Sequence, residues 1–183
     1  MKQIVWGALL AMASCGGPEP NAESPAPYER YLGVRELGLR GDAEAVRRIV
    51  LLLDDRHALV VVGALEALAD AGRKEFLQHV IPRTRHEHGL VRAAACRALG
   101  RLGNEEGLPA LAAALGDPDP SVSRSAVRAL AGFGRRPEVV GPLVEAVGAK
   151  EPSVALLAHE TLQALTGRRD VDRSKEAWAQ ALP

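Results

Sequence analysis

The chain has very few aromatic residues. Of its 183 residues, 47% are hydrophobic, but only 3% are aromatic, with two each of Phe, Tyr and Trp. A roughly spherical core normally uses aromatic rings to fill its volume, whereas close-packed helices in a row can do so with Ala, Val and Leu. The composition therefore favours a layered helical domain over a compact mixed fold.

The chain also has no excess of positive or negative charge, and it has no pattern of cysteines that indicates a set of disulfides. Lys and Arg number 23, as do Asp and Glu, so the formal net charge is zero. A nucleic-acid-binding protein normally carries a basic excess, so we expect no nucleic-acid partner. The two cysteines, Cys15 and Cys96, do not indicate a set of disulfides. No Ser-His-Asp grouping, phosphate-binding loop or paired-carboxylate motif is present, which predicts a non-enzyme without a cofactor.

The first residues read as a targeting segment. Lys2 is followed by an apolar run over residues 4–13, which is shorter than the roughly 20 residues that span a bilayer. Small residues then lead to Cys15, and residues 16–27 are rich in Gly, Pro, Glu, Asn and Ser. We therefore expect a signal peptide at 1–14, an extended tether at 15–27 and a folded domain at 28–183.

The sequence Met12-Ala13-Ser14-Cys15 resembles the lipobox of bacterial lipoproteins. The resemblance implies cleavage before Cys15 and lipidation of that cysteine, which would anchor the domain to a membrane of the cell envelope. Gly16 follows the cysteine where an aspartate would signal inner-membrane retention, so the resemblance implies the outer membrane, facing the periplasm. The alternative is an ordinary secretory signal with an incidental cysteine.

A pattern of valine, a small residue four positions later and leucine eight positions later recurs along the chain. Its start points, at 60, 91, 122 and 154, are 31, 31 and 32 residues apart. The four copies are Val60/Ala64/Leu68, Val91/Ala95/Leu99, Val122/Ala126/Leu130 and Val154/Ala158/Leu162. A second apolar pattern lies between them, at Val46/Ile49/Leu53, Leu77/Val80/Thr84, Leu108/Leu111/Leu115 and Val140/Leu143/Val147. Two helical patterns that alternate at one period predict stacked helical hairpins.

Local signals place the helix ends within each repeat. Pro120 and Pro152 suit the first turn of a helix, and glycines follow each valine pattern, at 72, 100 and 103, 132 and 134, and 167. The partner helices are expected near 43–53, 74–84, 108–115 and 138–147. An incomplete first copy, Tyr28 to Gly38, is expected to cap the stack.

The segment Val91-Arg92-x-x-Ala95-x-x-Ala98-Leu99-Gly100 resembles the HEAT-repeat superfamily, and the resemblance extends over about residues 28–167. It implies an all-α, right-handed superhelix of about four to five helical hairpins, a fold that serves mostly as a binding surface. In that family the arginine after the valine joins an Asp–Arg ladder between repeats. It is kept here only at Arg92, so we expect an interrupted ladder.

The end of the chain carries a related signal. Leu165-Thr166-Gly167 is followed by a polar turn and Trp178, as in many bacterial HEAT-like chains. This resemblance implies that Trp178 covers the open end of the last repeat, since terminal repeats of a solenoid need a cap. The alternative is an exposed tryptophan that binds a partner.

Two features leave a chemical function open. His86, His88 and the nearby His79 offer nitrogen ligands to a metal, while a solvated polar turn is the alternative. Cys96 lies among apolar positions, which favours a packing role over a reactive thiol. The alternative function is thus a metal-dependent or lyase-like accessory enzyme, since some HEAT-like chains resemble bilin lyases; only the shared repeat supports this.

The sixth position after each valine forms a charged series: Glu66, Arg97, Arg128 and Glu160. Neighbouring repeats would align these residues on the inner helical face. Arg92, Arg97, Arg124 and Arg128 then predict a binding site for an acidic protein partner, with Arg101 nearby. The alternative is a set of exposed ion pairs, Glu66 with Arg97 and Glu160 with Arg128, each contributing about 0–1 kcal/mol. We therefore predict a scaffold that recognises a protein by shape and charge.

Overall fold

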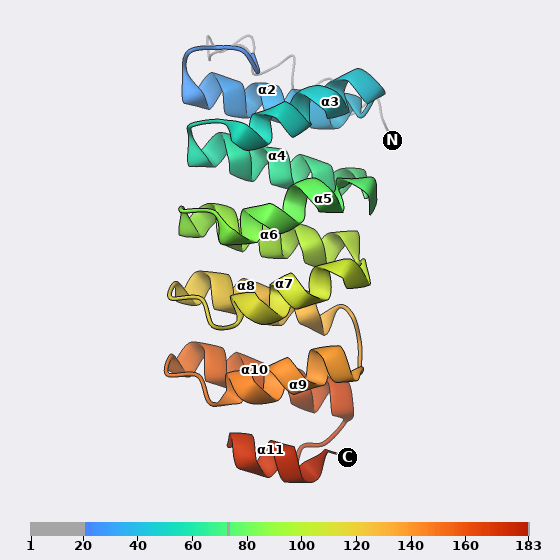
Figure 1. Ribbon diagram of the computed structural model, residues 1–183, viewed down its shortest axis with the longest axis vertical. Coiled ribbons are helices and arrows are strands. Elements are labelled where there is room, and N and C mark those ends of the chain that lie inside the picture. Colours follow the sequence, from blue (N-terminus) through green and yellow to red (C-terminus); the bar gives the residue numbers. More distant parts are fainter. Residues whose placement is uncertain (1–20, 73, 183) are drawn as a thin grey trace, which may run out of the picture. The chain divides into compact units, whose positions relative to one another are not determined.

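The computed structural model describes residues 21–72 and 74–182, and every regular element among them is a helix. Cys15 and the predicted signal peptide lie outside the described residues. Ten α-helices are present in the described part of the chain (Figure 1). They are α2 (Pro27–Arg40), α3 (Ala43–Leu51), α4 (Ala58–Ala71), α5 (Leu77–Val80), α6 (Gly89–Leu102), α7 (Leu108–Ala114), α8 (Pro120–Ala131), α9 (Pro137–Val147), α10 (Pro152–Thr166) and α11 (Lys175–Ala181).

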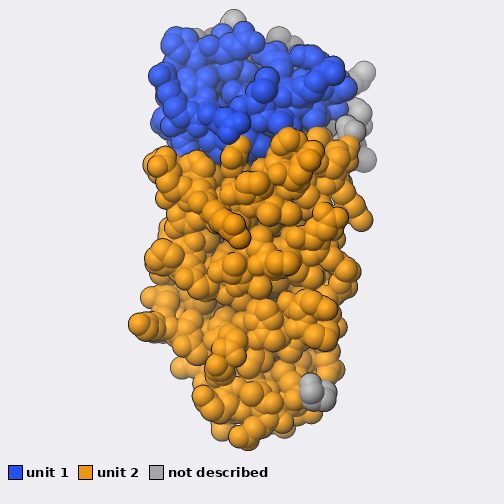
Figure 2. Space-filling view, viewed as in Figure 1, with its two compact units in different colours: residues 1–67 blue, residues 68–183 orange. Residues whose placement is uncertain are grey.

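The chain divides into two compact units, residues 1–67 and 68–183 (Figure 2). In the second unit the helices form two layers. Helices α6, α8 and α10 pack side by side in one layer, and α7, α9 and α11 follow one another in the other (Figure 1). We call the helices of the first layer B helices and those of the second layer A helices. This alternation confirms the all-α helical-hairpin repeat that the sequence predicted.

The valine–alanine–leucine pattern marks the buried stripe of the B helices. Val91, Ala95 and Leu99 are 0% exposed, as are Val122, Ala126 and Leu130 on the next B helix. Burial of each such valine or leucine contributes about 1.5–3 kcal/mol. Gly100 lies on the same side of α6, where an added Cβ would come 2.8 Å from the Cβ of Ala129. The sequence offered Gly100 and Gly103 as the end of this helix. In the structure α6 ends at Leu102 with Gly103 as its cap, and Gly100 lies inside the helix, where it allows α8 to approach closely.

Helix ends are set by left-handed glycines at a regular interval. Gly41, Gly72, Gly103, Gly134 and Gly167 have φ between 61° and 75°. An L-residue with a side chain is strained in this region, so glycine is favoured where the backbone must leave a helix. These positions confirm four of the ends that the sequence predicted and add Gly41.

The N-terminal part of the first unit differs from the prediction. Helix α2 extends beyond both ends of the expected segment Tyr28 to Gly38, and it begins at the last residue of the predicted tether. Ala22 and Ser24 are 9% and 4% exposed, so part of the expected tether is packed. Gly33 explains the contact, because a Cβ there would lie 2.1 Å from the backbone nitrogen of Ala22.

The expected single helix at 74–84 is also wrong. Residues 74–76 and 81–85 form 3-10 turns, and only Leu77–Val80 is α-helical. Pro82 supplies the reason, since a proline lacks an N–H and its ring clashes with the preceding helical turn. Thr84 donates its hydroxyl to the carbonyl of Ile81 at 2.8 Å and stabilises the tighter turn.

Helix α11 closes the C-terminal end of the second unit. Ser174 caps it by accepting the N–H of Ala177, and Trp178 on this helix is 0% exposed. The Trp178 Nε1–H donates to Nδ1 of His159 on α10 at 2.9 Å, and the two rings meet edge to face. Complete burial fits the capping role and contradicts an exposed tryptophan that binds a partner.

Candidate functional site

The exposed side of the B helices presents two arginines on neighbouring helices. Arg97 lies on α6 and Arg128 on α8, 31 residues apart, and both are exposed. Arg128 makes no hydrogen bond or ion pair with any residue in the described ranges. We call Arg97 and Arg128 the arginine surface. Its position is set by the buried stripe, because each arginine directly precedes a buried alanine–leucine pair of its helix.

Arg92, which the sequence assigned to partner binding, makes four hydrogen bonds within the repeats. Its Nε donates to Oδ2 of Asp117 at 2.7 Å and its Nη2 to Oδ1 at 2.8 Å. Its Nη1 donates to the backbone carbonyls of His86 and Glu87, each at 2.9 Å. The hydrogen bond with Asp117 is the main reason that the pKa of Arg92 is raised. Arg92 thus links the turn before α6 to the turn before α8, with its side chain only 16% exposed.

The same linkage recurs in the first unit at Arg30 and Asp55, which the sequence reasoning missed. Arg30 donates to both carboxylate oxygens of Asp55, at 2.6 and 2.9 Å, and to the carbonyls of Ser24 and Pro25. In each pair the arginine and the aspartate are 25 residues apart. Arg30 and Arg92 are separated by two repeats in the sequence. The expectation that only Arg92 keeps this arginine is therefore wrong. Glu29 precedes Arg30 where the other copies have valine, so the motif was hidden.

Arg124 and Arg101 also have partners in the second unit. Arg124 Nη1 donates to the hydroxyl of Ser153 at 2.9 Å, which links α8 to the first turn of α10. Arg101 forms an ion pair with Asp70 on α4. The ion pair of Arg128 with Glu160, which the sequence offered as an alternative, does not form among residues 74–182. Of the four arginines assigned to partner binding, Arg97 and Arg128 are exposed, whereas Arg92 and Arg124 stabilise the repeat.

The His86-Glu87-His88 segment forms a turn. The His88 N–H donates to Nδ1 of His86 at 3.1 Å, so this nitrogen accepts and is unprotonated. Asp55 and Asp117 accept the N–H of the residue two positions later in the same way. Burial, followed by the charge of His88, lowers the pKa of His86. No group of three possible metal ligands lies within the described residues, and the geometry favours the polar-turn alternative.

The thiol of Cys96 is unsuited to nucleophilic chemistry. Its side chain is 0% exposed on α6, and burial raises its pKa to about 12. The thiolate is the reactive form of cysteine, and a buried thiol with a raised pKa forms little of it near neutral pH. The structure therefore favours the packing role for Cys96 over a reactive thiol.

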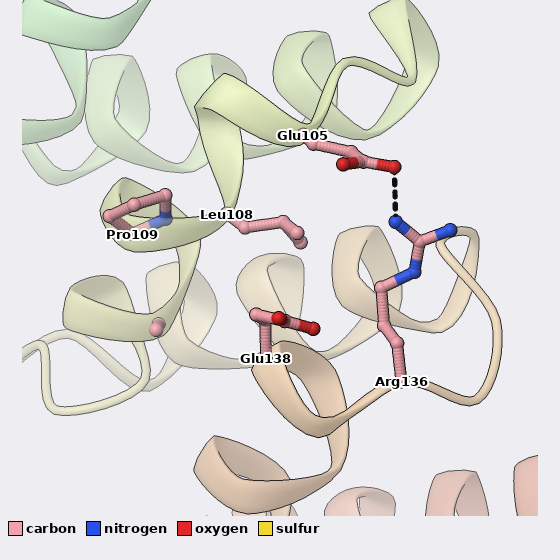
Figure 3. Close-up of a pocket in the computed structure, with 6 residues that line it drawn as sticks. Glu105, Leu108, Pro109, Arg136 and Glu138 are labelled. Atoms are coloured by element: carbon pink, nitrogen blue, oxygen red, sulfur yellow. Dashed lines mark hydrogen bonds and ion pairs between the residues drawn. The ribbon is translucent and has the colours of Figure 1, made fainter.

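The sequence reasoning missed two hollows on the side of the A helices. One, of about 400 Å³, lies between the start of α7 and the start of α9 (Figure 3). Leu108, Pro109 and Ala112 form its apolar wall, and Arg136 forms an ion pair with Glu105 across its rim. The second, of about 500 Å³, lies between α9 and α11. No motif marks either hollow, because both arise where consecutive A elements leave a gap.

Comparisons with known proteins agree with this architecture. Residues 77–166 match a family described as HEAT repeats. A protein of Pseudanabaena tenuis (strain PCC 7409), named uncharacterized phycocyanin operon protein Z, is 28% identical over 157 residues, which cover 81% of this chain and 77% of that protein.

Two solved structures show the same fold at lower identity. The complex of CpcE and CpcF of phycocyanin lyase from Nostoc sp. PCC7120 has a TM-score of 0.51 at 19% identity, over 81% of this chain and 78% of that chain. A designed armadillo repeat protein in complex with the peptide (KR)4 has a TM-score of 0.55 at 18% identity, over 78% of each chain. The fold is therefore that of HEAT and armadillo repeat proteins. No helix in the described part of the chain is long and apolar enough to cross a membrane.

Proposed function

We propose that the protein is a non-catalytic binding module that captures an acidic segment of a partner protein on its B helices. The observation that carries the proposal is the exposed guanidinium of Arg128, which no described residue neutralises. Arg97 lies one repeat away on the same side of the stack. Arginine forms two parallel hydrogen bonds with a carboxylate, so this surface suits Asp or Glu side chains.

The remaining charges favour a protein over a nucleic acid. A phosphate backbone is bound by a broad basic stripe, whereas the arginine surface here is narrow and the net charge of the chain is zero. Glu160 is exposed on α10, the B helix that follows Arg128, and would repel a continuous polyanion. A short acidic segment of a protein would be small enough to bind the arginine surface without approaching Glu160.

The double substitution Arg97→Glu and Arg128→Glu tests the proposal. We expect at least tenfold weaker capture of the partner, about 1.4 kcal/mol, since both charges then repel an acidic segment. The partner is identified by crosslinking the full-length chain in the bacterial envelope, and its affinity is then measured with purified components at two salt concentrations. Arg168→Glu with Arg169→Glu is the matched control, since it changes the net charge equally at exposed positions after α10. Equal capture by both double variants would refute the arginine surface.

We further propose that the module is anchored to the outer membrane, facing the periplasm, by a lipid on Cys15. The support is the apolar run over residues 4–13 and the lipobox-like residues before the cysteine. A Cys15→Ser variant should leave the membrane fraction and lose incorporation of a labelled fatty acid. Retention of the variant in that fraction with unchanged labelling would refute the anchor.

A second candidate function is an accessory role for a phycobiliprotein. The observation that favours it is the 28% identity with phycocyanin operon protein Z over most of both chains. A lyase-like activity would need a group that handles a bilin, and the one described cysteine is buried. We therefore favour binding of the bilin-carrying subunit over bond formation. Capture of purified phycocyanin subunits that is lost in the Arg97/Arg128 double variant would support this role, and covalent bilin attachment during that assay would show an enzyme instead.

A further inference from the structure

The gap between α9 and α11 forms a groove in the second unit, on the side of the A helices. Its volume is about 500 Å³, within the usual range for ligand sites. In Figure 1 the two bounding helices are the orange α9 and the red α11. Val140, Val144 and Leu182 supply apolar wall, while Arg135 and Arg136 lie at one end. This groove is separate from the arginine surface and shares no residue with it.

Gly141 lies in the wall of this groove at a position where packing does not require glycine. A Cβ added there would meet no atom of residues 21–72 or 74–182 within 4 Å, and the backbone is helical. Glycine inside a helix destabilises it relative to alanine, and Pro142 follows directly, so this turn of α9 gives up helix stability. At Gly100 close packing of α8 explains the missing side chain, but at Gly141 no contact among the described residues does. The open space above Gly141 is available to a group from outside.

The charges of the groove differ between its ends. Lys175 and Glu145 form an ion pair near one end, which neutralises both side chains. Arg136 is paired with Glu105, whereas Arg135 is exposed and makes no ion pair with any described residue. The groove therefore combines an apolar wall with a positive charge at the end formed by Arg135.

We infer that this groove is a second docking site, and that its occupant is a short segment of a partner protein. The segment places an apolar side chain over Gly141 and a carboxylate beside Arg135. A ligand of this kind uses both the apolar wall and the unpaired charge, and neither a basic peptide nor a purely apolar one does. Since the groove and the arginine surface lie on different layers of the stack, one chain can hold two segments.

Selection of peptides from a phage-displayed library of random 12-residue peptides on the full-length chain tests this inference. We expect enriched peptides that carry Asp or Glu next to a large apolar residue. A synthetic copy should bind at least tenfold more weakly to Gly141→Phe, which fills the groove, and to Arg135→Glu. Amide hydrogen exchange should show protection by the peptide at residues 140–144 and 179–182.

Two variants separate this inference from the proposed function. Gly141→Ala adds one methyl group, so it should raise the unfolding temperature and keep peptide binding within about threefold, which controls for folding. Arg97→Glu with Arg128→Glu should leave groove binding unchanged. Failure of enrichment, peptides without an acidic preference, or equal binding to Gly141→Phe would overturn the inference. A concentration-dependent dimer that Gly141→Phe abolishes would also overturn it, because a second copy would then be the occupant.

Discussion

Replacing Trp178 with alanine should lower the free energy of unfolding by about 3–5 kcal/mol, the range for loss of a large buried aromatic side chain. Trp178 is 0% exposed and is the largest fully buried side chain among the described residues. Its removal takes away the side chain by which α11 covers α9 and α10. Urea denaturation followed by circular dichroism measures the loss, and this signal does not depend on the second tryptophan, Trp6.

Trp178→Phe is the matched control for the cap. It keeps an aromatic ring but loses the Nε1 donor to His159, so we expect a smaller loss of about 1 kcal/mol. Limited proteolysis adds a local measurement, since detachment of α11 should expose the loop at residues 168–174. A Trp178→Ala chain that unfolds at the same urea concentration as the original chain would contradict the capping role.

Most of the fold could be predicted because the buried stripe of each B helix repeats in the sequence. Val91, Ala95 and Leu99 and their equivalents are the buried positions that the pattern indicated. Hydrophobic periodicity and glycine spacing are properties of short stretches of sequence, so they predict helices without knowledge of the tertiary structure. The errors at the N-terminus and at residues 74–84 arose where Gly33 and Pro82 alter local geometry.

The candidate site was harder to predict because charge in a sequence does not say where a side chain bonds. Arg92, Arg97, Arg124 and Arg128 look alike in the sequence. In the structure, Asp117 and two backbone carbonyls hold Arg92, and Ser153 holds Arg124. Asp117 lies 25 residues from Arg92 and Ser153 lies 29 residues from Arg124, so only packed repeats bring these partners together.

The arginine surface and the groove between α9 and α11 also differ in how well the sequence indicates them. The arginine surface repeats at the period of the helices, so a sequence pattern could indicate it. The groove between α9 and α11 depends on α11, which does not repeat, and on the absence of a side chain at Gly141. A sequence pattern does not indicate a site that depends on a missing side chain, which explains why the groove was found only in the structure.

The ion pair between Arg30 and Asp55 should make the stability of the first unit sensitive to acid. Burial raises the pKa of Asp55, but the hydrogen bonds from Arg30 and from the His57 N–H outweigh it, so the pKa lies below its usual value. Asp55 therefore contributes stability above its unfolded-state pKa of about 3.9, and this contribution is lost as the pH falls through the lower folded-state value. The equivalent linkage at Arg92 is the better target for substitution, because its two turns begin the helices of the arginine surface.

Breaking the Arg92–Asp117 pair should cost about 3 kcal/mol of unfolding free energy, near the lower end of the range for a buried ion pair that loses one member. Arg92→Met keeps the aliphatic stem of the side chain but leaves the Asp117 carboxylate, which is 9% exposed, without its main donor. Asp117→Asn keeps the Oδ1 acceptor for the Asp119 N–H but removes the negative charge and the Oδ2 acceptor of the Arg92 Nε–H. Urea unfolding of both single variants and of the double variant measures the coupling between the two residues.

The double variant Arg92→Met with Asp117→Asn decides whether the pair stabilises or orients the repeat. Both charges are then removed while an Oδ1 acceptor remains for the Asp119 N–H, so we expect it to recover more than half of the stability lost in Arg92→Met. If the pair also orients α6 against α8, the recovered protein should still bind its partner more weakly, since the spacing of Arg97 and Arg128 depends on those helices. Full recovery of binding along with stability would limit the pair to a stabilising role, and additive losses in the cycle would contradict direct coupling.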